Sequence, residues 1–228
     1  MVYLSAVCGY NNAFRGDMKK LVCLDTETTG FSPDHDRIVE IGCVEITNGW
    51  ANRASFQKYI NPNRSMPENA FRIHGLSLDF LSKFEKFDKY ADDFLNFIEG
   101  ATLIIHNASF DMKFLNAELI RSGRKALENE VIDTLTIAKK EFPKRKVNLD
   151  ALSSYFNINK SRDKHGALLD SEILAQIYIA MQLKQTVLSV KQEAKTYSGT
   201  AFDKTISVSQ NEQSTHESII KSLKEEKN

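Results

Sequence analysis

The 228-residue sequence contains little cysteine, no excess charge of either sign and no long apolar run. Its three cysteines, Cys8, Cys23 and Cys43, are too few and too scattered for a disulfide framework or a cysteine-based zinc site. Such sparse cysteine usage fits the reducing cytoplasm, which is the location that we expect. No apolar stretch approaches the roughly 18 residues that a membrane-spanning helix needs, so we expect no membrane partner.

The charges of the chain balance, because 30 basic and 30 acidic residues give a formal net charge of zero. Domains that hold nucleic acid by bulk electrostatics are usually strongly basic, so this balance argues against that class of protein. The hydrophobic fraction of 42% excludes a wholly disordered chain. The length suits one domain of ordinary size with an appendage.

Hydrophobic periodicity predicts an α/β fold that opens with antiparallel strands. Apolar runs and alternation predict three strands, over 21–24, 37–47 and 50–60, and Asn48-Gly49 is a strong hairpin signal between the last two. After these strands, the sequence predicts helices that alternate with two short strands. The predicted helices cover 90–98, 109–115 with Ser109 as N-cap, 135–140, 149–155 and 167–183, and the short strands cover 103–105 and 131–132.

Composition divides the chain into three parts. Residues 1–17 precede the first predicted strand and are expected to be an N-terminal extension. Residues 18–184 carry the periodic pattern and form the predicted domain. Residues 185–228 are rich in Ser, Thr, Lys, Glu and Gln and lack sustained periodicity, so we expect a flexible C-terminal tail.

Two carboxylates, Asp25 and Glu27, close the first predicted strand. Because they are two residues apart on an extended chain, their side chains point the same way and repel each other. A divalent cation between them would relieve this repulsion, and oxygen ligands favour Mg²⁺ or Mn²⁺. A solvated strand end is the alternative interpretation of the pair taken alone.

Three more residues stand at comparable places: Asp111 and Asp170 in the first turns of predicted helices, and His165 in a loop. Each has an ordinary interpretation, because an acid complements a helix N-terminus and a lone loop histidine is usually a surface residue. Together with Asp25 and Glu27, however, they can build a two-metal site for phosphodiester hydrolysis. In such a site His165 can take the proton from the attacking water.

Three blocks of the sequence resemble the exonuclease motifs of the DEDDh (DnaQ-like) 3′–5′ exonucleases: LVCLDTETTG, HNASFDMKFL and HGALLDSEILAQIY. The third block contains the His-x4-Asp spacing that separates this branch from its Tyr-containing relatives. The segment HGALLD, together with NLDALSSYF upstream, most resembles the epsilon branch of this family, the proofreading subunits of bacterial DNA polymerase III. The resemblance covers roughly residues 19–181 and implies an RNase H-like fold, with a mixed five-stranded sheet flanked by helices.

The resemblance implies a role for each residue of the constellation. Asp25, Glu27 and Asp170 would hold two divalent metal ions, Mg²⁺ or Mn²⁺, and contact the substrate. Asp111 would complete the site, partly through water, and His165 would be the general base.

The resemblance also implies contacts with the terminal nucleotide. His74 matches a position that makes such a contact in the family. The acid that commonly stands five residues before this histidine is Asn69 here, so either Asn69 donates the bond or the neighbouring Glu68 serves instead. The further candidates for this contact are Thr28, Asn107 and Phe110, of which Phe110 fits the hydrophobic core equally well.

Partners follow from the same resemblance. The substrate would be a DNA 3′ end, and the tail would tether the domain to the catalytic (alpha) subunit of the polymerase. A small accessory (theta-like) subunit is a further candidate partner. The segment from Gln185 to Val190 resembles a sliding-clamp-binding peptide anchored by Gln185, Leu188 and Val190, although Val190 stands where an aromatic residue is usual.

We therefore predict a metal-dependent 3′–5′ exonuclease that removes mismatched nucleotides from DNA. An RNA-trimming exoribonuclease of the same family and a non-catalytic polymerase scaffold of the same fold are the alternatives. A scaffold would have no use for paired, repelling carboxylates. Two bound divalent ions would cancel the charge of the four site acids, so the neutral total no longer argues against a nucleic-acid enzyme.

Overall fold

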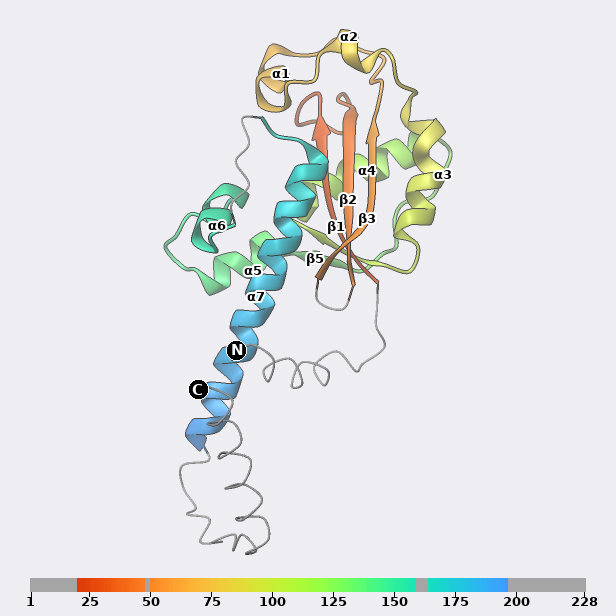
Figure 1. The fold of residues 1–228 in the computed structure, drawn as a ribbon. Helices are drawn as coiled ribbons and strands as arrows, with labels where there is room; N and C mark the ends of the chain where they lie inside the picture. Colours follow the sequence, from red (N-terminus) through yellow and green to blue (C-terminus); the bar gives the residue numbers. More distant parts are fainter. Residues whose placement is uncertain (1–19, 48–49, 159–163, 197–228) are drawn as a thin grey trace, which may run out of the picture. The chain divides into compact units, whose positions relative to one another are not determined.

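A computed structural model gives the fold and describes residues 20–47, 50–158 and 164–196, with the side-chain surroundings of 50–53 and 185–196 left out (Figure 1). The chain divides into two units, residues 1–185 and 186–228. The first unit contains the sheet and the site. Among the described helices, none is both long enough and apolar enough to cross a membrane.

A mixed five-stranded sheet in the order β3-β2-β1-β4-β5 forms the centre of the first unit. Its strands are β1 (Leu21–Thr28), β2 (Ile38–Thr47), β3 (Trp50–Tyr59), β4 (Thr102–Ile105) and β5 (Val131–Asp133). β2 pairs antiparallel with both β1 and β3, whereas β4 pairs parallel with both β1 and β5. This arrangement confirms the predicted mixed sheet with an antiparallel beginning.

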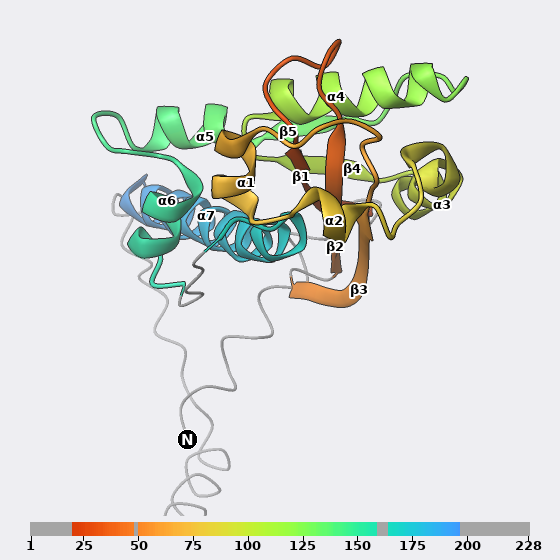
Figure 2. The ribbon, with the colours of Figure 1, turned by 90° about the horizontal axis from the view of Figure 1, so that it is seen from above.

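Helices cover both faces of this sheet, with α4 on one side and α7 on the other (Figure 2). The helices are α1 (Glu68–His74), α2 (Leu78–Leu81), α3 (Phe87–Ile98), α4 (Ala108–Arg121), α5 (Thr134–Glu141), α6 (Leu149–Tyr155) and α7 (Ala167–Thr196).

The central strand β1 contributes to two separate cores, because successive side chains of a strand point to opposite faces. Val22 and Leu24 pack with Phe94 of α3 and Phe114 of α4 in one hydrophobic cluster. Cys23 packs on the other face with residues of α7. Since β1 is covered on both sides, it reads in the sequence as a continuous apolar run.

The start of α7 lies directly against β2 at Gly42. A Cβ atom at Gly42 would lie only 2.2 Å from backbone atoms of Ala167 and Leu168, so no larger residue fits there. The Ser171 hydroxyl donates a hydrogen bond to the Gly42 carbonyl (2.8 Å), and the Ala167 N–H donates to the Glu40 carboxylate (3.2 Å). These contacts fix the first turn of α7 on the sheet.

Two predicted boundaries differ from the structure in ways that affect the site. β1 continues to Thr28, so its two carboxylates lie within the strand and not after it. α4 begins at Ala108, and its N-cap is Asn107, in a left-handed conformation (φ 72°), so the prediction of Ser109 as N-cap was wrong. Asparagine tolerates this conformation better than most residues do, which explains its place at this sharp turn.

Other differences concern helices. α1 and α2 were not predicted, because 7 and 4 residues are too few to show a helical period. α7 runs to Thr196, beyond the predicted end at residue 183, since no glycine or proline interrupts it. The predicted extension over 1–17, the Asn48-Gly49 turn and the tail beyond Thr196 lie outside the described residues.

We expect Gly42→Ala to lower the free energy of unfolding by about 1–3 kcal/mol, because the added methyl group must push α7 away from β2. Urea unfolding of the full chain measures this change. Gly166→Ala is the matched control, since its Cβ would meet no atom closer than 3.9 Å. A Gly42→Ala protein as stable as the control would contradict the close packing.

Candidate active site

The site lies where β1 ends between α4 and α7. Asp25 and Glu27 share the face of β1 that carries Cys23 and is covered by α7, whereas Thr26 points to the opposite face, toward α4. Asp25 stands opposite Gly42 of β2 in the antiparallel ladder. The strand therefore presents carboxylates to the helix that starts at this close contact.

Glu27, His165 and Asp170 come together at this end of the sheet. One ligand atom of each lies within 4.8 Å of the ligand atoms of the other two. The His165 Nδ1 and Asp170 Oδ2 atoms are 3.2 Å apart. Glu27 and Asp170 are buried, whereas the His165 side chain is 45% exposed. The arrangement combines two shielded carboxylates with an imidazole that water can reach.

Helix α1 holds the loop that carries His165. The His165 N–H donates a hydrogen bond to the Ile73 carbonyl (3.1 Å), and the Lys164 ammonium donates to the Arg72 carbonyl (2.7 Å). The Asp170 N–H, in turn, donates to the Gly166 carbonyl (2.9 Å), in the first turn of α7. The imidazole is thus placed by α1 and the carboxylate by α7.

Asp111 reaches β1 from the opposite face. Its Oδ1 atom accepts hydrogen bonds from the Thr26 N–H (3.0 Å) and the Thr26 hydroxyl (2.7 Å). Burial raises the pKa of Asp111 to about 7, and the negative charge of Asp133 adds to the rise, while the bonds from Thr26 oppose it. Burial disfavours the charged form of this carboxylate, and a nearby cation would lower its pKa again and so restore the ionised form.

His74 is the last residue of α1 and is buried. Burial lowers its pKa to about 4, with a further contribution from the positive charge of Lys164, so the imidazole is neutral at pH 7. Its Nδ1 accepts a hydrogen bond from the Leu76 N–H (3.0 Å). His74 and His165 line the same hollow of about 270 Å³, so the structure brings this predicted nucleotide contact beside the predicted base.

The remaining predicted substrate contacts are less closely grouped. Glu68 forms an ion pair with Arg72 on the exposed side of α1 (3.1 Å), and Asn69 is exposed beside it. The Thr28 hydroxyl donates to the Gly30 carbonyl (2.6 Å), and the Asn107 side chain is exposed at the start of α4. The role of each residue with the nucleotide stays a prediction.

Sequence reasoning did not predict Phe31, which follows the first carboxylate motif. The residue is 76% exposed, and its ring contacts the ring of Phe110 edge-on, with 6.3 Å between the centroids. Phe110 also packs against Phe114 in the core, which confirms its packing role, whereas its contact with the nucleotide stays a prediction. A large apolar side chain left exposed in the loop that follows Glu27 is the feature that marks Phe31.

Asp133 was missed as well. Its Oδ1 atom accepts hydrogen bonds from the N–H groups of Asn107 (3.1 Å) and Leu135 (3.0 Å), so it ties the start of α4 to the start of α5. Its role depends on two parallel strands ending side by side, which local spacing does not show.

The donor set fits divalent metal ions. Carboxylate oxygens suit Mg²⁺ and Mn²⁺, and the clustered carboxylates Glu27 and Asp170 repel each other unless a positive charge lies between them. Asp25 lies two residues from Glu27 on the same face of β1. The site therefore has both the ligand chemistry and the electrostatic need for such ions.

Comparison with known proteins places the chain in a family. The profile of the RNase_T family, described as Exonuclease, matches residues 22–178. The chain belongs to this exonuclease family. It is a 3′–5′ exonuclease, as the three motifs predict.

Curated relatives of this exonuclease share much of its length. The DNA polymerase III subunit epsilon of Rickettsia felis is 49% identical over 166 residues, which cover 70% of this chain and 72% of that protein. The protein of the same name from Escherichia coli K12 is 38% identical over 185 residues, which cover 77% of this chain and 76% of that protein.

Solved structures confirm the RNase H-like exonuclease fold. Exonuclease X in complex with 5′ overhanging duplex DNA has a TM-score of 0.58 at 24% identity, covering 72% of this chain and 92% of that one. The nuclease domain of 3′hExo, a DEDDh family member bound to rAMP, has a TM-score of 0.62 at 18% identity, covering 73% and 92%. At these identities the likeness concerns the fold alone.

The buried Asp111 predicts a pH dependence of stability in the metal-free exonuclease. Its folded pKa of about 7 lies above the ordinary value of 3.8, so the folded state binds the proton more tightly than the unfolded state does. The contribution of Asp111 to stability is therefore full below pH 4 and is lost as the pH rises toward 7. We expect Asp111→Asn, in EDTA, to be more stable than the unmodified chain at pH 8.

Urea unfolding at pH 5 and pH 8 measures this effect, and the difference between the two proteins isolates Asp111 from other titrating groups. The advantage of Asp111→Asn should be smaller at pH 5. An Asp111→Asn protein less stable than the unmodified chain at pH 8 would show that the carboxylate is not strained in the metal-free fold.

Proposed function

We propose that this exonuclease is the proofreading subunit of a cytoplasmic bacterial replicase. It removes mismatched 3′-terminal nucleotides from DNA by two-metal phosphodiester hydrolysis, with His165 as the general base. The observation that carries this proposal is the convergence of Glu27, His165 and Asp170 at the end of the central strand. The relatives named as DNA polymerase III epsilon subunits favour DNA over the RNA-trimming alternative.

The metal ligands that we propose are Asp25, Glu27 and Asp170, with Asp111 contributing through water. Two Mg²⁺ or Mn²⁺ ions bound there would activate water and neutralise the negative charge that develops at the phosphate. The chain itself supplies buried carboxylates at fixed positions, since β2 pairs with β1 and holds the first turn of α7 at Gly42. The complete carboxylate set argues against a non-catalytic scaffold.

His165 fits the role of the base by its geometry. The Asp170 carboxylate lies 3.2 Å from Nδ1 and orients the ring, so Nε2 is the atom that would take the proton from the attacking water. The side chain is 45% exposed, which lets the proton pass on to solvent after each turnover. The bond between the His165 N–H and Ile73 keeps the loop in place.

The terminal nucleotide would lie between the histidines and the aromatic pair. Neutral His74 can donate a hydrogen bond without adding charge, and Phe31 with Phe110 offers ring surface on which a base can stack. Asn69 or Glu68 would contact the 3′ end. The further proposed contacts are Thr28 and Asn107.

We assign the tether to residues 185–228. They would join the exonuclease to the catalytic (alpha) subunit of the polymerase, and Gln185, Leu188 and Val190 would contact a sliding clamp. These three residues fall in the part of α7 whose side chains are not described. A theta-like accessory subunit is a further proposed partner. A tethered enzyme needs little DNA affinity of its own, in keeping with the neutral chain.

Asp25→Ala or His165→Ala should lower nucleotide release by at least about a hundredfold while leaving the fold intact, because each removes a group that acts on the reacting phosphate or water. The assay uses an end-labelled primer with a mismatched 3′ end, single-stranded DNA and RNA, in Mg²⁺ or Mn²⁺. Asp93→Ala, an exposed acid on α3, is the control. Hydrolysis retained by purified Asp25→Ala protein would refute the mechanism, and faster cleavage of RNA would favour the exoribonuclease.

Truncation after Lys184 should leave exonuclease activity unchanged and abolish binding to the polymerase catalytic subunit. The truncated chain keeps the contacts that Lys184 makes with Phe142 and Tyr155 at the end of the domain. Co-purification with the catalytic subunit and the primer assay measure the two properties separately. Unchanged binding to the polymerase would refute the role of the tail.

A further inference from the structure

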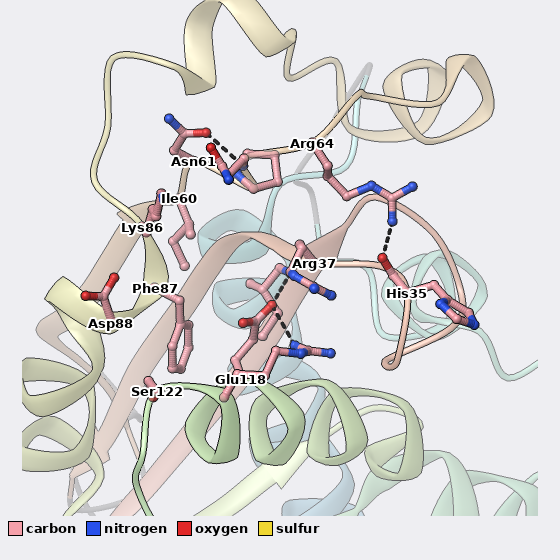
Figure 3. Close-up of a pocket in the computed structure, with 14 residues that line it drawn as sticks. His35, Arg37, Ile60, Asn61, Arg64, Lys86, Phe87, Asp88, Glu118 and Ser122 are labelled. Carbon is pink, nitrogen blue, oxygen red and sulfur yellow. Dashed lines mark hydrogen bonds and ion pairs between the residues drawn. The ribbon is translucent and has the colours of Figure 1, made fainter.

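A second hollow, of about 790 Å³, is larger than the one beside His74 and His165. Figure 3 shows the residues that line it. The hollow lies where β2 begins and β3 ends, bordered by the first turn of α3 and the last turn of α4. Four basic side chains from four separate segments line it. They are Arg37, Arg64, Lys86 and Arg121.

The arginines of this hollow use few of their hydrogen-bond donors within the protein. Arg37 donates from Nη1 to the Asp36 carbonyl (2.7 Å), and Arg64 donates from Nη1 to the Asp36 carboxylate (2.7 Å) and to the carbonyl of His35. A guanidinium has five N–H groups, so each arginine keeps donors for another acceptor. Arg121 is the third, paired with Glu118 at 3.2 Å and bonded to the carbonyl of Pro33.

The charges of the lining are not balanced. Of the four cations, Arg121 is paired with Glu118 and Arg64 with Asp36, which leaves Arg37 and Lys86 against the single further acid of the lining, Asp88. Within the described part of the chain, Arg37 and Lys86 form no ion pair. Like charges held around one hollow repel one another, and an anion bound between them would remove this cost. The planar fork of arginine suits the oxygens of a phosphate group.

One residue of the hollow, Arg37, is joined through its backbone to the end of the active-site strand. Thr28 of β1 stands opposite Ile38 of β2, and the Thr29 N–H donates a hydrogen bond to the Arg37 carbonyl (2.9 Å). Arg37 is therefore bonded to the segment that directly follows Glu27. A nucleic-acid strand whose 3′ end occupied the active site would carry a phosphate at every nucleotide, and the hollow offers such phosphates cations next to the segment that follows Glu27.

We propose that this hollow is a second nucleotide-phosphate site, which holds the backbone of the DNA strand upstream of the bond that is cut. Its assignment to DNA rests on the proposed function. The site supplies affinity and register rather than chemistry, because Arg37 and Lys86 contact phosphate and not the reacting atoms. A chain with zero net charge thereby concentrates cations where the substrate strand passes.

The test compares two substrates of the full chain. A nitrophenyl ester of thymidine 5′-monophosphate fills the catalytic site alone, whereas a single-stranded oligothymidylate also reaches the hollow. Arg37→Gln should raise KM for the oligonucleotide about tenfold and leave kcat and the ester reaction unchanged. The slope of log(kcat/KM) against log salt should fall by about 0.7, the loss of one phosphate contact on a single strand.

Two further variants sharpen the result. Lys86→Gln should act in the same direction, and Arg37→Lys should restore part of the affinity because it keeps the charge but not the fork. Lys89→Gln is the matched control, since Lys89 is exposed in the first turn of α3, which borders the hollow, but is not among the residues that line the hollow. Wild-type KM and salt slope in Arg37→Gln would overturn the proposal.

Binding without cleavage separates this proposal from the proposed function. Fluorescence anisotropy of the labelled oligothymidylate in EDTA should show weaker binding by Arg37→Gln even if the chain hydrolyses neither substrate. Equal binding by both proteins would overturn the site. Free thymidine monophosphate should inhibit the unmodified chain and Arg37→Gln equally. Weaker inhibition of Arg37→Gln would mean that the hollow binds the phosphate of the released nucleotide, which would overturn the proposal that it binds the DNA strand.

Discussion

The close contact between the first turn of α7 and β2 at Gly42 is the constraint on which the site depends. Gly42 stands opposite Asp25, and Glu40, which accepts a hydrogen bond from the first N–H of α7, stands opposite Glu27. The helix therefore starts beside the two carboxylates of β1. A side chain at Gly42 would push this turn away from β2, and Asp170, which lies in the same turn, away from Glu27.

The two faces of β1 carry different parts of the site. The face toward α7 carries Asp25 and Glu27, and the face toward α4 carries Thr26, which binds Asp111 with both its N–H and its hydroxyl. This alternation concentrates negative charge around one strand end, and the raised pKa of Asp111 shows what burial costs the metal-free chain. Such strain is expected where a protein keeps groups for function at the expense of stability.

Sequence reasoning predicted the strands because apolar runs are local, and the family resemblance implied the mixed five-stranded sheet. Of the five residues of the carboxylate and histidine constellation, the structure brings Glu27, His165 and Asp170 together, and the roles of all five stay predictions. Sequence reasoning missed Gly42 and Asp133, whose roles arise only when strands distant in sequence lie side by side. It also missed Phe31, since exposure of an aromatic side chain cannot be read from spacing. Asn107 was named as a candidate substrate contact, which stays a prediction, and its place as the N-cap of α4 was missed.

The central claim is that this strand end holds two divalent ions between carboxylates from β1, α4 and α7. Calorimetric titration of the metal-free full chain with Mn²⁺ tests it most directly, with Asp170→Asn measured in parallel. The account predicts two Mn²⁺ ions per chain, and weaker or incomplete binding by Asp170→Asn. Absence of Mn²⁺ binding, or identical titrations of the two proteins, would contradict it.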